Sequence, residues 1–524
     1  MQVRFPDSWT YSRDVQGLRL EYARIVSEQW QAKLGVQSTV QTGALSNIYD
    51  KWIETNFDIH WGGGWGGRPA RLDPQTFLNA FSSGDASDIN YCNYDSEEYT
   101  EVIGNVRSST NEEERVEYVY RAQEILNEDV PVLFMFATNA LTAANTENWE
   151  NYTLGVGSRP LTNVWNWQSM QNTGGSDSAA VMADTRFPTT INPMGLEANI
   201  DMVAAKFFYD RLFRLDTEGN PKPWAASDWT AQDSSTYDVT IQDDMTFHDG
   251  EPVEPENIQF TIEYYQEWEV PYIQSFYGVI DQVEILGENK VRFHLNGPNA
   301  AFVSTSLSQL LILPKHIWDG VAEQQGLEHP RNWSGFDKTG SGPLTVESYD
   351  SSGRIVYGVH DNHFSQFNLS RFVMNSYGGK SVALGDVENG NASYLEELQP
   401  NQYERVKSQQ KIKASEAPSH GWGAIYLNNS RPPLNDKVMR QALFHAMDKE
   451  LILETVFSGY ADAIAGPIPP AMERWHNPEL EAYDGGTEQA RSILLEAGYK
   501  WDQNGNLLMP NDVATASDNT ASPS

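Results

Sequence analysis

Hydrophobic residues recur at helical spacing early in the chain. Between residues 14 and 35 they stand three or four positions apart, and Gly35 follows as a stop signal, so the pattern predicts an amphipathic helix. The next expected elements are a short strand at 36–42, a helix at 45–53, an apolar strand at 57–61 and a glycine-dense loop at 62–67.

The same alternation continues through the rest of the chain. A capping-type Ser-Thr-Asn stretch at 109–111 precedes a helical pattern that ends before Pro131. The pattern then predicts a helix at 112–128, strands at 132–136 and 237–241, a helix at 252–268, a hairpin of 283–286 with 291–295, and a helix at 435–457. Repeated alternation of strands and helices indicates an α/β or α+β protein with several lobes.

Two stretches have little to bury. Residues 168–180 are rich in Gly, Ser and Asn, which is a linker composition, and the residues from Pro510 onward have the composition of a disordered tail. At roughly 150 residues per domain, a chain of 524 residues is expected to hold two to four domains.

The chain is strongly acidic along its whole length. It has 72 Asp and Glu against 36 Lys and Arg, a formal net charge of -36 at pH 7. Such self-repulsion strains a compact protein in ordinary buffer and is largely screened in molar salt, where the Debye length falls to about 3 Å. We favour a halophilic archaeal source, with an acidic protein of moderate salt as the alternative. So acidic a surface argues against a nucleic-acid partner.

Several other classes of protein are excluded by motif. Cys92 is the one cysteine, which excludes a disulfide framework and a cysteine-built metal site. No apolar run is long enough for a membrane span, and no basic-then-apolar leader follows Met1. Gly378-Gly379-Lys380-Ser381 fails the phosphate-loop spacing, because Met374 stands where the first glycine is required. Neither H-E-x-x-H nor G-x-S-x-G is present, so we expect no cofactor, no metal and no catalysis.

A set of short motifs occurs in order over the later part of the chain. They are Pro223-Trp224-Ala225-Ala226-Ser227, Phe247-His248-Asp249-Gly250, Gly340-Ser341-Gly342-Pro343, Pro432-Pro433-Leu434-Asn435-Asp436, Arg440-Gln441-Ala442-Leu443 and Glu496-Ala497-Gly498-Tyr499. Each motif alone is weak evidence. Together they resemble the signatures of the extracellular solute-binding proteins of the oligopeptide/dipeptide class, family 5, which feed ATP-driven importers.

The segments stand in a different order from that of the family they resemble. Residues 184–510 resemble the family's N-terminal two thirds, whereas residues 1–167 resemble its C-terminal third. The two pieces neither overlap nor leave a gap. We therefore interpret the chain as a circular permutant in which 168–180 joins the old termini, a change that costs few contacts when termini lie together at the surface. The alternative is a splice of two tandem genes.

The resemblance implies an α/β fold with two lobes, periplasmic-binding-protein-like (type II, peptide-binding class), with an extra subdomain and circularly permuted. The implied division is 1–133 second lobe, 134–167 crossover and return to the first lobe, 168–180 linker, 181–218 first lobe, 219–330 extra subdomain, 331–428 first lobe and crossover, 429–510 second lobe, and 511–524 disordered tail. The two crossover strands are expected near 424–428 and 134–143.

A ligand site is also implied by the resemblance. Its expected contacts are, in chain order, Gly64, Trp65, Gly66, Arg68, Asp73, Glu197, His420 and Trp422. In peptide-binding relatives the glycine-tryptophan loop lends backbone groups to an extended peptide, and glycine permits that close approach. A glycine-rich surface turn is the alternative interpretation.

Arg68 stands where peptide-binding relatives carry an Asp that pairs with the peptide's α-ammonium. A cation there repels a peptide N-terminus, which disfavours a standard peptide ligand. Asp73 is either a substitute for that Asp or a helix cap. Glu197 is either a contact from the first lobe or an ordinary surface acid, and Trp422 either lines the cleft with His420 or packs in the core.

The implied function is that of the substrate-binding component of an ABC-type importer, which captures a peptide or similarly sized polar solute by hinge closure. Its expected partners are that ligand and an ABC permease, at the extracellular face of the cell membrane, with the protein itself a monomer. One alternative is an oligosaccharide receptor on the same scaffold, suggested by the 16 Trp. The other is a glycoside hydrolase, although no particular acid pair stands out.

Overall fold

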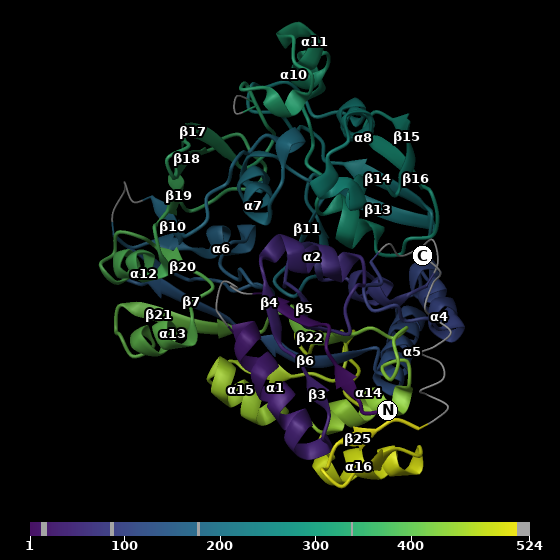
Figure 1. Cartoon of the computed structure of the whole chain (residues 1–524). Helices are drawn as coiled ribbons and strands as arrows, with labels where there is room; N and C mark the ends of the chain where they lie inside the picture. Colours follow the sequence, from purple (N-terminus) through teal and green to yellow (C-terminus); the bar gives the residue numbers. More distant parts are fainter. Residues whose placement is uncertain (12–17, 84–88, 175–178, 337–338, 511–524) are drawn as a thin grey trace.

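A computed structural model describes residues 1–11, 18–83, 89–174, 179–336 and 339–510, and it has two lobes (Figure 1). Each lobe is built on one large sheet with helices on both faces, and a smaller antiparallel sheet extends the first lobe. In Figure 1 the extension lies at the top, the sheet of the first lobe lies at the left, and the second lobe lies at the bottom and lower right.

The first lobe contains a seven-stranded sheet. Its strands in spatial order are β17 (Leu344–Asp350), β18 (Arg354–Val359), β19 (Arg371–Ser376), β10 (Ala180–Asp184), β20 (Tyr394–Leu395), β7 (Ala140–Asn145) and β21 (Ile412–Ala417). One face packs on α12 (Lys380–Glu388) and α13 (Pro400–Val406). The other face packs on α6 (Val164–Ser169) and α7 (Asn199–Phe208).

The extension of the first lobe is a four-stranded antiparallel sheet with its own helices. The strands in spatial order are β13 (Ala226–Asp233), β14 (Thr236–Ile241), β16 (Lys290–Leu295) and β15 (Ile280–Gly287). The helices are α8 (Pro255–Trp268), α9 (Gln274–Tyr277), α10 (Lys315–Trp318) and α11 (Val321–Gln325). Two short pairs complete this half, β11 (Phe213–Leu215) with β12 (Pro221–Pro223) and β8 (Trp149–Glu150) with β9 (Gln171–Asn172).

The second lobe contains a six-stranded sheet drawn from distant parts of the chain. Its strands in spatial order are β23 (Ala461–Ala463), β6 (Val132–Thr138), β22 (Trp422–Leu427), β5 (Ile59–Trp65), β2 (Ser8–Tyr11) and β4 (Gln41–Gly43). Alternate residues of β6 face opposite sides: Leu133 and Met135 enter one core, and Val132 and Phe134 enter the other. This period of two is what a sheet covered on both faces requires.

Helices from both ends of the chain cover this sheet. One face packs on α1 (Leu18–Leu34), α14 (Lys437–His445), α15 (Lys449–Phe457) and α16 (Gly486–Glu496). The other face packs on α2 (Leu45–Ile53), α3 (Pro74–Leu78), α4 (Glu97–Ser108) and α5 (Glu112–Asp129). The remaining pairs are β1 (Arg4–Phe5) with β3 (Gln37–Ser38) and β24 (Lys500–Trp501) with β25 (Leu507–Leu508).

The two ends of the described chain meet in the second lobe. The Val3 amide donates to the Leu507 carbonyl at 2.9 Å, and the Met509 amide donates to the Met1 carbonyl at 2.8 Å. The Trp30 indole donates to the Leu443 carbonyl at 2.9 Å, deep in the same core. The described residues of 1–138 and 422–510 therefore form one body, and Figure 1 shows the N-terminus beside β25.

The chain passes between the two large sheets twice. β21 lies in the first sheet and β22 in the second, so one passage lies at 418–421. β6 lies in the second sheet and β7 in the first, so the other passage lies at Asn139. The first passage falls slightly before the expected position of 424–428, which lies inside β22 and beyond.

Most elements expected from periodicity form close to their predicted bounds, and three do not. The strand expected at 36–42 is two short strands, β3 and β4, which pair with β1 and β2 respectively. The glycine-dense stretch 62–67 is not simply a loop, because Gly62 to Trp65 continue β5 against β22. The helix expected at 435–457 is two helices, because Asp448 accepts the Leu451 amide at 3.0 Å and so caps a new helix. The expected tail at 511–524, part of the linker and the first turn of the helix expected at 14–35 lie outside the described residues.

Candidate ligand site between the lobes

The glycines of β5 allow it to lie unusually close to β22. Gly64 pairs with Gly423 and has φ +148°, a conformation that L side chains rarely adopt. A Cβ added to Gly64 would lie 2.3 Å from the Trp422 carbonyl oxygen, and one added to Gly63 would lie 2.0 Å from the Tyr426 ring. Only glycine therefore fits at these two positions, and the end of β5 is held at the edge of the cleft.

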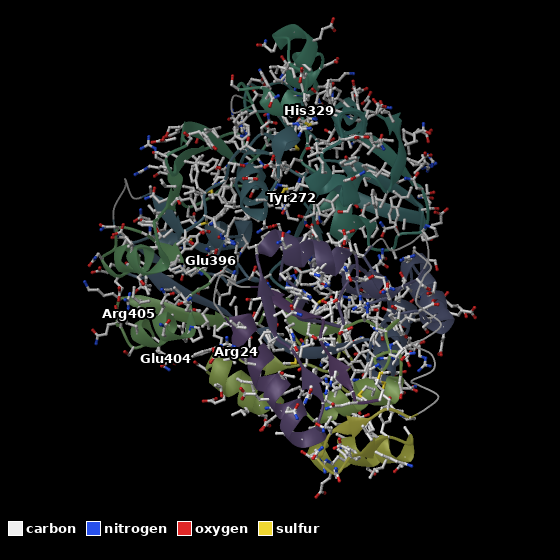
Figure 2. The ribbon with its side chains drawn as sticks, in the orientation of Figure 1. Arg24, Tyr272, His329, Glu396, Glu404 and Arg405 are labelled. Atoms are coloured by element: carbon white, nitrogen blue, oxygen red, sulfur yellow. The ribbon has the colours of Figure 1, made fainter. Side chains whose placement is uncertain are left out.

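Cavities lie between the lobes at this edge. One of them, which we call the interlobe cavity, has a volume of about 430 Å³. Its walls include Trp65, Arg68 and Arg71 from the second lobe and Lys206 and Tyr272 from the other side. Figure 2 labels Tyr272 near the centre of the molecule. Because both sides contribute, closing or opening of the lobes changes the shape of this cavity.

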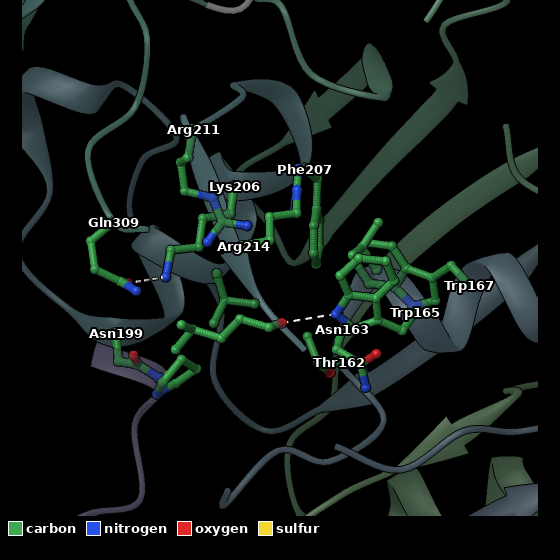
Figure 3. A pocket seen from close by; sticks show the side chains of 14 residues that line it. Thr162, Asn163, Trp165, Trp167, Asn199, Lys206, Phe207, Arg211, Arg214 and Gln309 are labelled. Carbon is green, nitrogen blue, oxygen red and sulfur yellow. Dashed lines mark hydrogen bonds between the residues drawn. The ribbon is translucent and has the colours of Figure 1, made fainter. Parts of the chain in front are cut away.

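A smaller pocket continues the interlobe cavity into the first lobe (Figure 3). This inner pocket has a volume of about 100 Å³ and shares Pro69, Asn199, Lys206 and Gln309 with the interlobe cavity. A further cavity of about 240 Å³ is lined by residues 63–67 of the glycine strand together with Trp422. Trp65 belongs to both that cavity and the interlobe cavity, so it stands between them.

Trp65 is held in place by two neighbours. The Arg71 guanidinium carbon lies over the indole ring, 4.6 Å from its centre. The indole nitrogen donates to the Tyr426 hydroxyl at 3.2 Å. Burial, and then the neighbouring Arg68 charge, lower the pKa of Arg71 to about 10. The ring is thus a fixed, aromatic part of the cavity wall.

Arg68 connects the two sides of the cleft. Its guanidinium donates to the Tyr272 hydroxyl at 3.5 Å, from the second lobe to the extension of the first. Its backbone carbonyl contacts His420 Nε2 at 2.7 Å. Arg68 itself is exposed, so the guanidinium remains accessible to a ligand.

Asp73 is occupied by the fold. Its carboxylate forms a two-pronged ion pair with the buried Arg115, at 2.6 and 3.0 Å, and accepts the Ser304 hydroxyl at 3.0 Å. It also accepts the Gln75 amide at 3.0 Å and so caps α3. Both oxygens are engaged, which favours the helix-cap interpretation over that of a ligand carboxylate.

The remaining expected contacts divide between the cleft and the core. Trp422 lines the 240 Å³ cavity but also packs edge-on against Phe134, with ring centres 5.3 Å apart. His420 is fully buried, and burial lowers its pKa to about 4. Glu197 is exposed and does not line the interlobe cavity, the inner pocket or the 240 Å³ cavity.

The structure therefore brings together Gly64, Trp65, Gly66 and Trp422 on one cavity and Trp65 with Arg68 on the next. The family-like sequence motifs do not include several further residues that line the interlobe cavity, namely Arg71, Asn199, Lys206, Tyr272 and Gln309. Lys206 alone carries a usable signal, because it is a single lysine in the apolar stretch Val203-Ala204-Ala205-Lys206-Phe207-Phe208 of α7.

Two features are absent from residues 1–11, 18–83, 89–174, 179–336 and 339–510: a cluster of metal ligands and a helix able to cross a membrane. Nowhere in that part of the chain do three or more His, Cys, Asp or Glu side chains gather so that they might hold a metal ion. Within the same ranges, every helix is too short or too polar to cross a bilayer.

Two lobes joined by two passages, with a cavity between them, define the class of two-lobed solute-binding proteins. The chain belongs to the bacterial extracellular solute-binding proteins, family 5, whose middle-region profile matches residues 220–523.

Curated relatives are distant and match part of their length. The chain is 25% identical over 324 residues to the probable D,D-dipeptide-binding periplasmic protein DdpA of Escherichia coli, covering 60% of each chain. It is 24% identical over 314 residues to the dipeptide-binding protein of Escherichia coli, covering 55% of this chain and 57% of the relative. The chain thus spans about 60% of the length of the curated relatives it matches.

Solved structures support the fold. HbpA2 from Haemophilus parasuis superposes with a TM-score of 0.53 at 20% identity, covering 61% of this chain and 67% of that one. The ABC transporter substrate-binding protein CtaP from Listeria monocytogenes superposes with a TM-score of 0.51 at 21% identity, covering 62% and 66%. At this identity the likeness concerns the architecture.

Proposed function

We propose that this protein is the substrate-binding component of an ABC-type importer. It captures a peptide or similarly sized polar solute between its two lobes, and the ligand stabilises the closed form by touching both. The observation that carries this proposal is the interlobe cavity of about 430 Å³, whose walls come from both sides of the cleft. A volume of this size is in the usual range for small-ligand sites.

The remaining parts of the proposal follow from the family. The partner is an ABC permease that recognises the closed form at the extracellular face of the cell membrane, and the receptor acts as a monomer. It needs no cofactor and carries out no reaction. Among the expected contacts we propose that Gly64, Trp65, Gly66, Arg68 and Trp422 meet the ligand, since they line the described cavities.

Calorimetric titration in about molar KCl, where like charge is screened, tests this function. We expect one member of a panel of peptides and oligosaccharides to bind saturably with one site per chain and to be recovered unchanged. Trp65→Ala should weaken that binding about tenfold, because it removes a fixed aromatic wall. Turnover of a panel member without saturable binding would contradict the receptor.

An oligosaccharide receptor is the second candidate. The observation in its favour is that Trp65, Tyr272 and Phe276 line the interlobe cavity, and flat rings suit the faces of sugars. The same titration separates the two, because only the oligosaccharide arm would then saturate. The hydrolase alternative has no such support, since it requires a pair of carboxyl groups in the cleft.

We also propose that the chain is circularly permuted relative to its family. Support comes from the six-stranded sheet, which combines β2, β4, β5 and β6 with β22 and β23, and from the contact of Val3 with Leu507. The implied lobe boundaries, with the linker at 168–180, belong to this proposal, and a tandem-gene splice is its alternative.

Restoring the family order tests the permutation. In that variant Pro510 is joined to Met1 by a short Gly-Ser bridge, and the chain opens between residues 167 and 181. We expect this variant to have the same unfolding midpoint and ligand affinity as the unaltered protein, because Met1 and Met509 at the new junction already lie in contact. A variant that fails to fold, although the bridge can span the gap, would contradict the proposal.

The last part of the proposal is that the protein is adapted to high salt. A net charge of -36 on one chain favours a protein adapted to brine, as in halophilic archaea. We expect the near-ultraviolet circular dichroism to be lost as KCl is lowered from molar to about 0.1 M, where the Debye length reaches about 10 Å. A protein that keeps its signal at low salt is an acidic protein of moderate salt.

A further inference from the structure

The charge of the cleft is opposite to the charge of the protein. The interlobe cavity and the inner pocket are lined by five cationic residues, Arg68, Arg71, Lys206, Arg211 and Arg214. Among the described residues that line these two spaces there is no Asp or Glu. Asp85 and Asp88 lie outside the described ranges and are not covered by this statement. In a chain with twice as many acids as bases, such a lining calls for an explanation.

Of the three cations that line the inner pocket, Arg214 pairs with a buried carboxylate, that of Asp210. Asp210 accepts the Arg214 guanidinium at 3.4 Å and the Trp224 indole at 2.7 Å, and it pairs with His363 at 3.1 Å. With these three partners, the Asp210 carboxylate has little capacity left to accept further hydrogen bonds. Lys206 and Arg211 are therefore left without a carboxylate partner among the described hydrogen bonds and ion pairs of this cluster.

The described hydrogen bonds of Lys206 and Arg211 are to neutral groups, which compensate a buried positive charge only weakly. The Lys206 ammonium donates to the Gln309 side-chain oxygen at 2.5 Å, as the dashed line in Figure 3 shows. Arg211 is 8% exposed and donates to the Ser308 carbonyl at 3.0 Å. The Nε atoms of Arg211 and Arg214 are buried and have no described hydrogen-bond partner. A buried charge left in this state is costly unless a counter-charge arrives.

The three side chains converge on one space. Figure 3 shows Lys206, Arg211 and Arg214 close together on one wall of the inner pocket. Burial, followed by the charges of Arg211 and Arg214, holds the pKa of Lys206 well below its usual range. On the facing side of the interlobe cavity Arg68 and Arg71 add two further cations. An anion between these walls relieves repulsion on both sides at once.

We propose that the ligand captured in this cleft is a small anionic solute, carrying a carboxylate or phosphate group that Lys206 and the neighbouring guanidiniums bind. This inference rests on the proposed receptor function and names the substrate class of the same site. Arg68 and Arg71 then contact the anion from the second lobe, so that the negative charge itself favours closure. Trp65, Phe207 and Tyr272 provide apolar surface for the uncharged part of the solute.

Four dipeptides of similar size, each acetylated at its N-terminus and amidated at its C-terminus so that only the side chains carry charge, test the proposal by calorimetry in about molar KCl. They are Glu-Glu and phosphoserine-alanine as anionic probes, Ala-Ala as the neutral probe, and Lys-Lys as the basic probe. We expect at least one anionic probe to bind at least tenfold more tightly than Lys-Lys. The two anionic probes distinguish a carboxylate from a phosphate preference.

Variants identify the residues responsible. Lys206→Met should weaken the anionic probe at least tenfold and change Ala-Ala less than threefold, because it removes charge and keeps length. Arg71→Met should act in the same direction. The matched control is Lys437→Met, at a 41% exposed lysine of α14 whose partners are Glu128 and Asp129 and which lines none of the described cavities. It should leave all affinities unchanged.

Each outcome decides between the two proposals. Lys-Lys binding as tightly as the anionic probes would overturn the anionic ligand and leave the receptor intact. A Lys206→Met variant that weakens every probe equally would do the same, since the effect would then be one of shape. If a folded wild-type protein binds none of the four probes, this inference fails, and the receptor function is then decided by the wider panel of peptides and oligosaccharides.

Discussion

Arg115 and the cluster of Lys206, Arg211 and Arg214 are two cationic sites with different environments. Arg115 has the Asp73 carboxylate at 2.6 and 3.0 Å, and the carbonyl of Val106 accepts its Nε. In the cluster, Arg214 contacts Asp210, which is already shared with Trp224 and His363. Lys206 and Arg211 have no carboxylate partner among the described contacts. The first site is complete within the fold, while the second is incomplete. A buried cation that is paired with a carboxylate stabilises the fold. A buried cation without such a partner is available to bind an anionic ligand in the cleft.

The largest expected effect comes from breaking the complete site. Asp73→Asn leaves Arg115 buried without its counter-ion, although an Asn still caps α3. We expect the free energy of unfolding to fall by about 3–5 kcal/mol, measured by urea denaturation in molar salt. Relative affinities for acidic and basic dipeptides should not change. A shift of ligand preference with unchanged stability would reverse the roles assigned to the two sites.

Glu396 extends the comparison to a buried acid in the first lobe, near the centre-left of Figure 2. It accepts the Leu161 and Thr162 amides at 2.6 and 3.1 Å, and its nearest guanidinium contact is Arg159 at 4.0 Å. Burial raises its pKa from 4.5 to about 7. The folded state therefore retains a proton that the unfolded chain releases above pH 4.5.

The stability that Glu396 contributes should be fully present below about pH 4.5 and lost as the pH rises through about 7. For a shift of this size the change is roughly 3 kcal/mol at most. We expect wild type to lose more stability than Glu396→Gln between pH 5 and pH 7.5, by urea denaturation at constant salt. Parallel profiles for the two proteins would show that Glu396 is ionised throughout.

Lys206→Met should have a smaller effect, and of opposite sign to Asp73→Asn. Replacing an uncompensated cation by an apolar side chain of similar length is neutral or stabilising, here by about 1 kcal/mol. The midpoint of urea denaturation should stay or rise while anion binding is lost. A marked loss of stability would show that Lys206 supports the fold, and would remove the contrast with Arg115.

The smallest effect is expected at the surface. Lys437 is 41% exposed and contacts Glu128 at 2.7 Å, at a position open to water and salt. Lys437→Met should change the free energy of unfolding by less than about 0.5 kcal/mol and leave ligand affinity unchanged. A larger loss would mean that exposure does not separate weak from strong charge pairs in this protein.

Much of the architecture follows from local sequence. The spacing of apolar residues gives α5 to within one residue and the end of α8, although α8 begins three residues later than expected. Gly287 to Lys290 mark the hairpin of β15 and β16. The break between α14 and α15 was missed because the apolar period runs through it, and only the cap at Asp448 reveals it. Local periodicity finds elements, but a single polar side chain decides where they stop.

The site is less predictable than the fold. Gly64 and Trp65 stand out by their motif, yet the strand they form depends on pairing with residues more than 350 positions away. The cationic lining depends on the same distant contacts, because Arg71 and Lys206 meet only when the lobes are assembled. Sequence alone cannot show that Asp73 is occupied by Arg115, which decides that it is not a free carboxylate.

The position of β22 between β5 and β6 has a consequence for synthesis. Both neighbours leave the ribosome hundreds of residues before Trp422–Leu427 does, so each has an open hydrogen-bonding edge in the nascent polypeptide. The second lobe therefore finishes folding only after the first lobe has been translated in full. Translation speed and chaperone supply should then govern the yield of folded protein more strongly than equilibrium stability does.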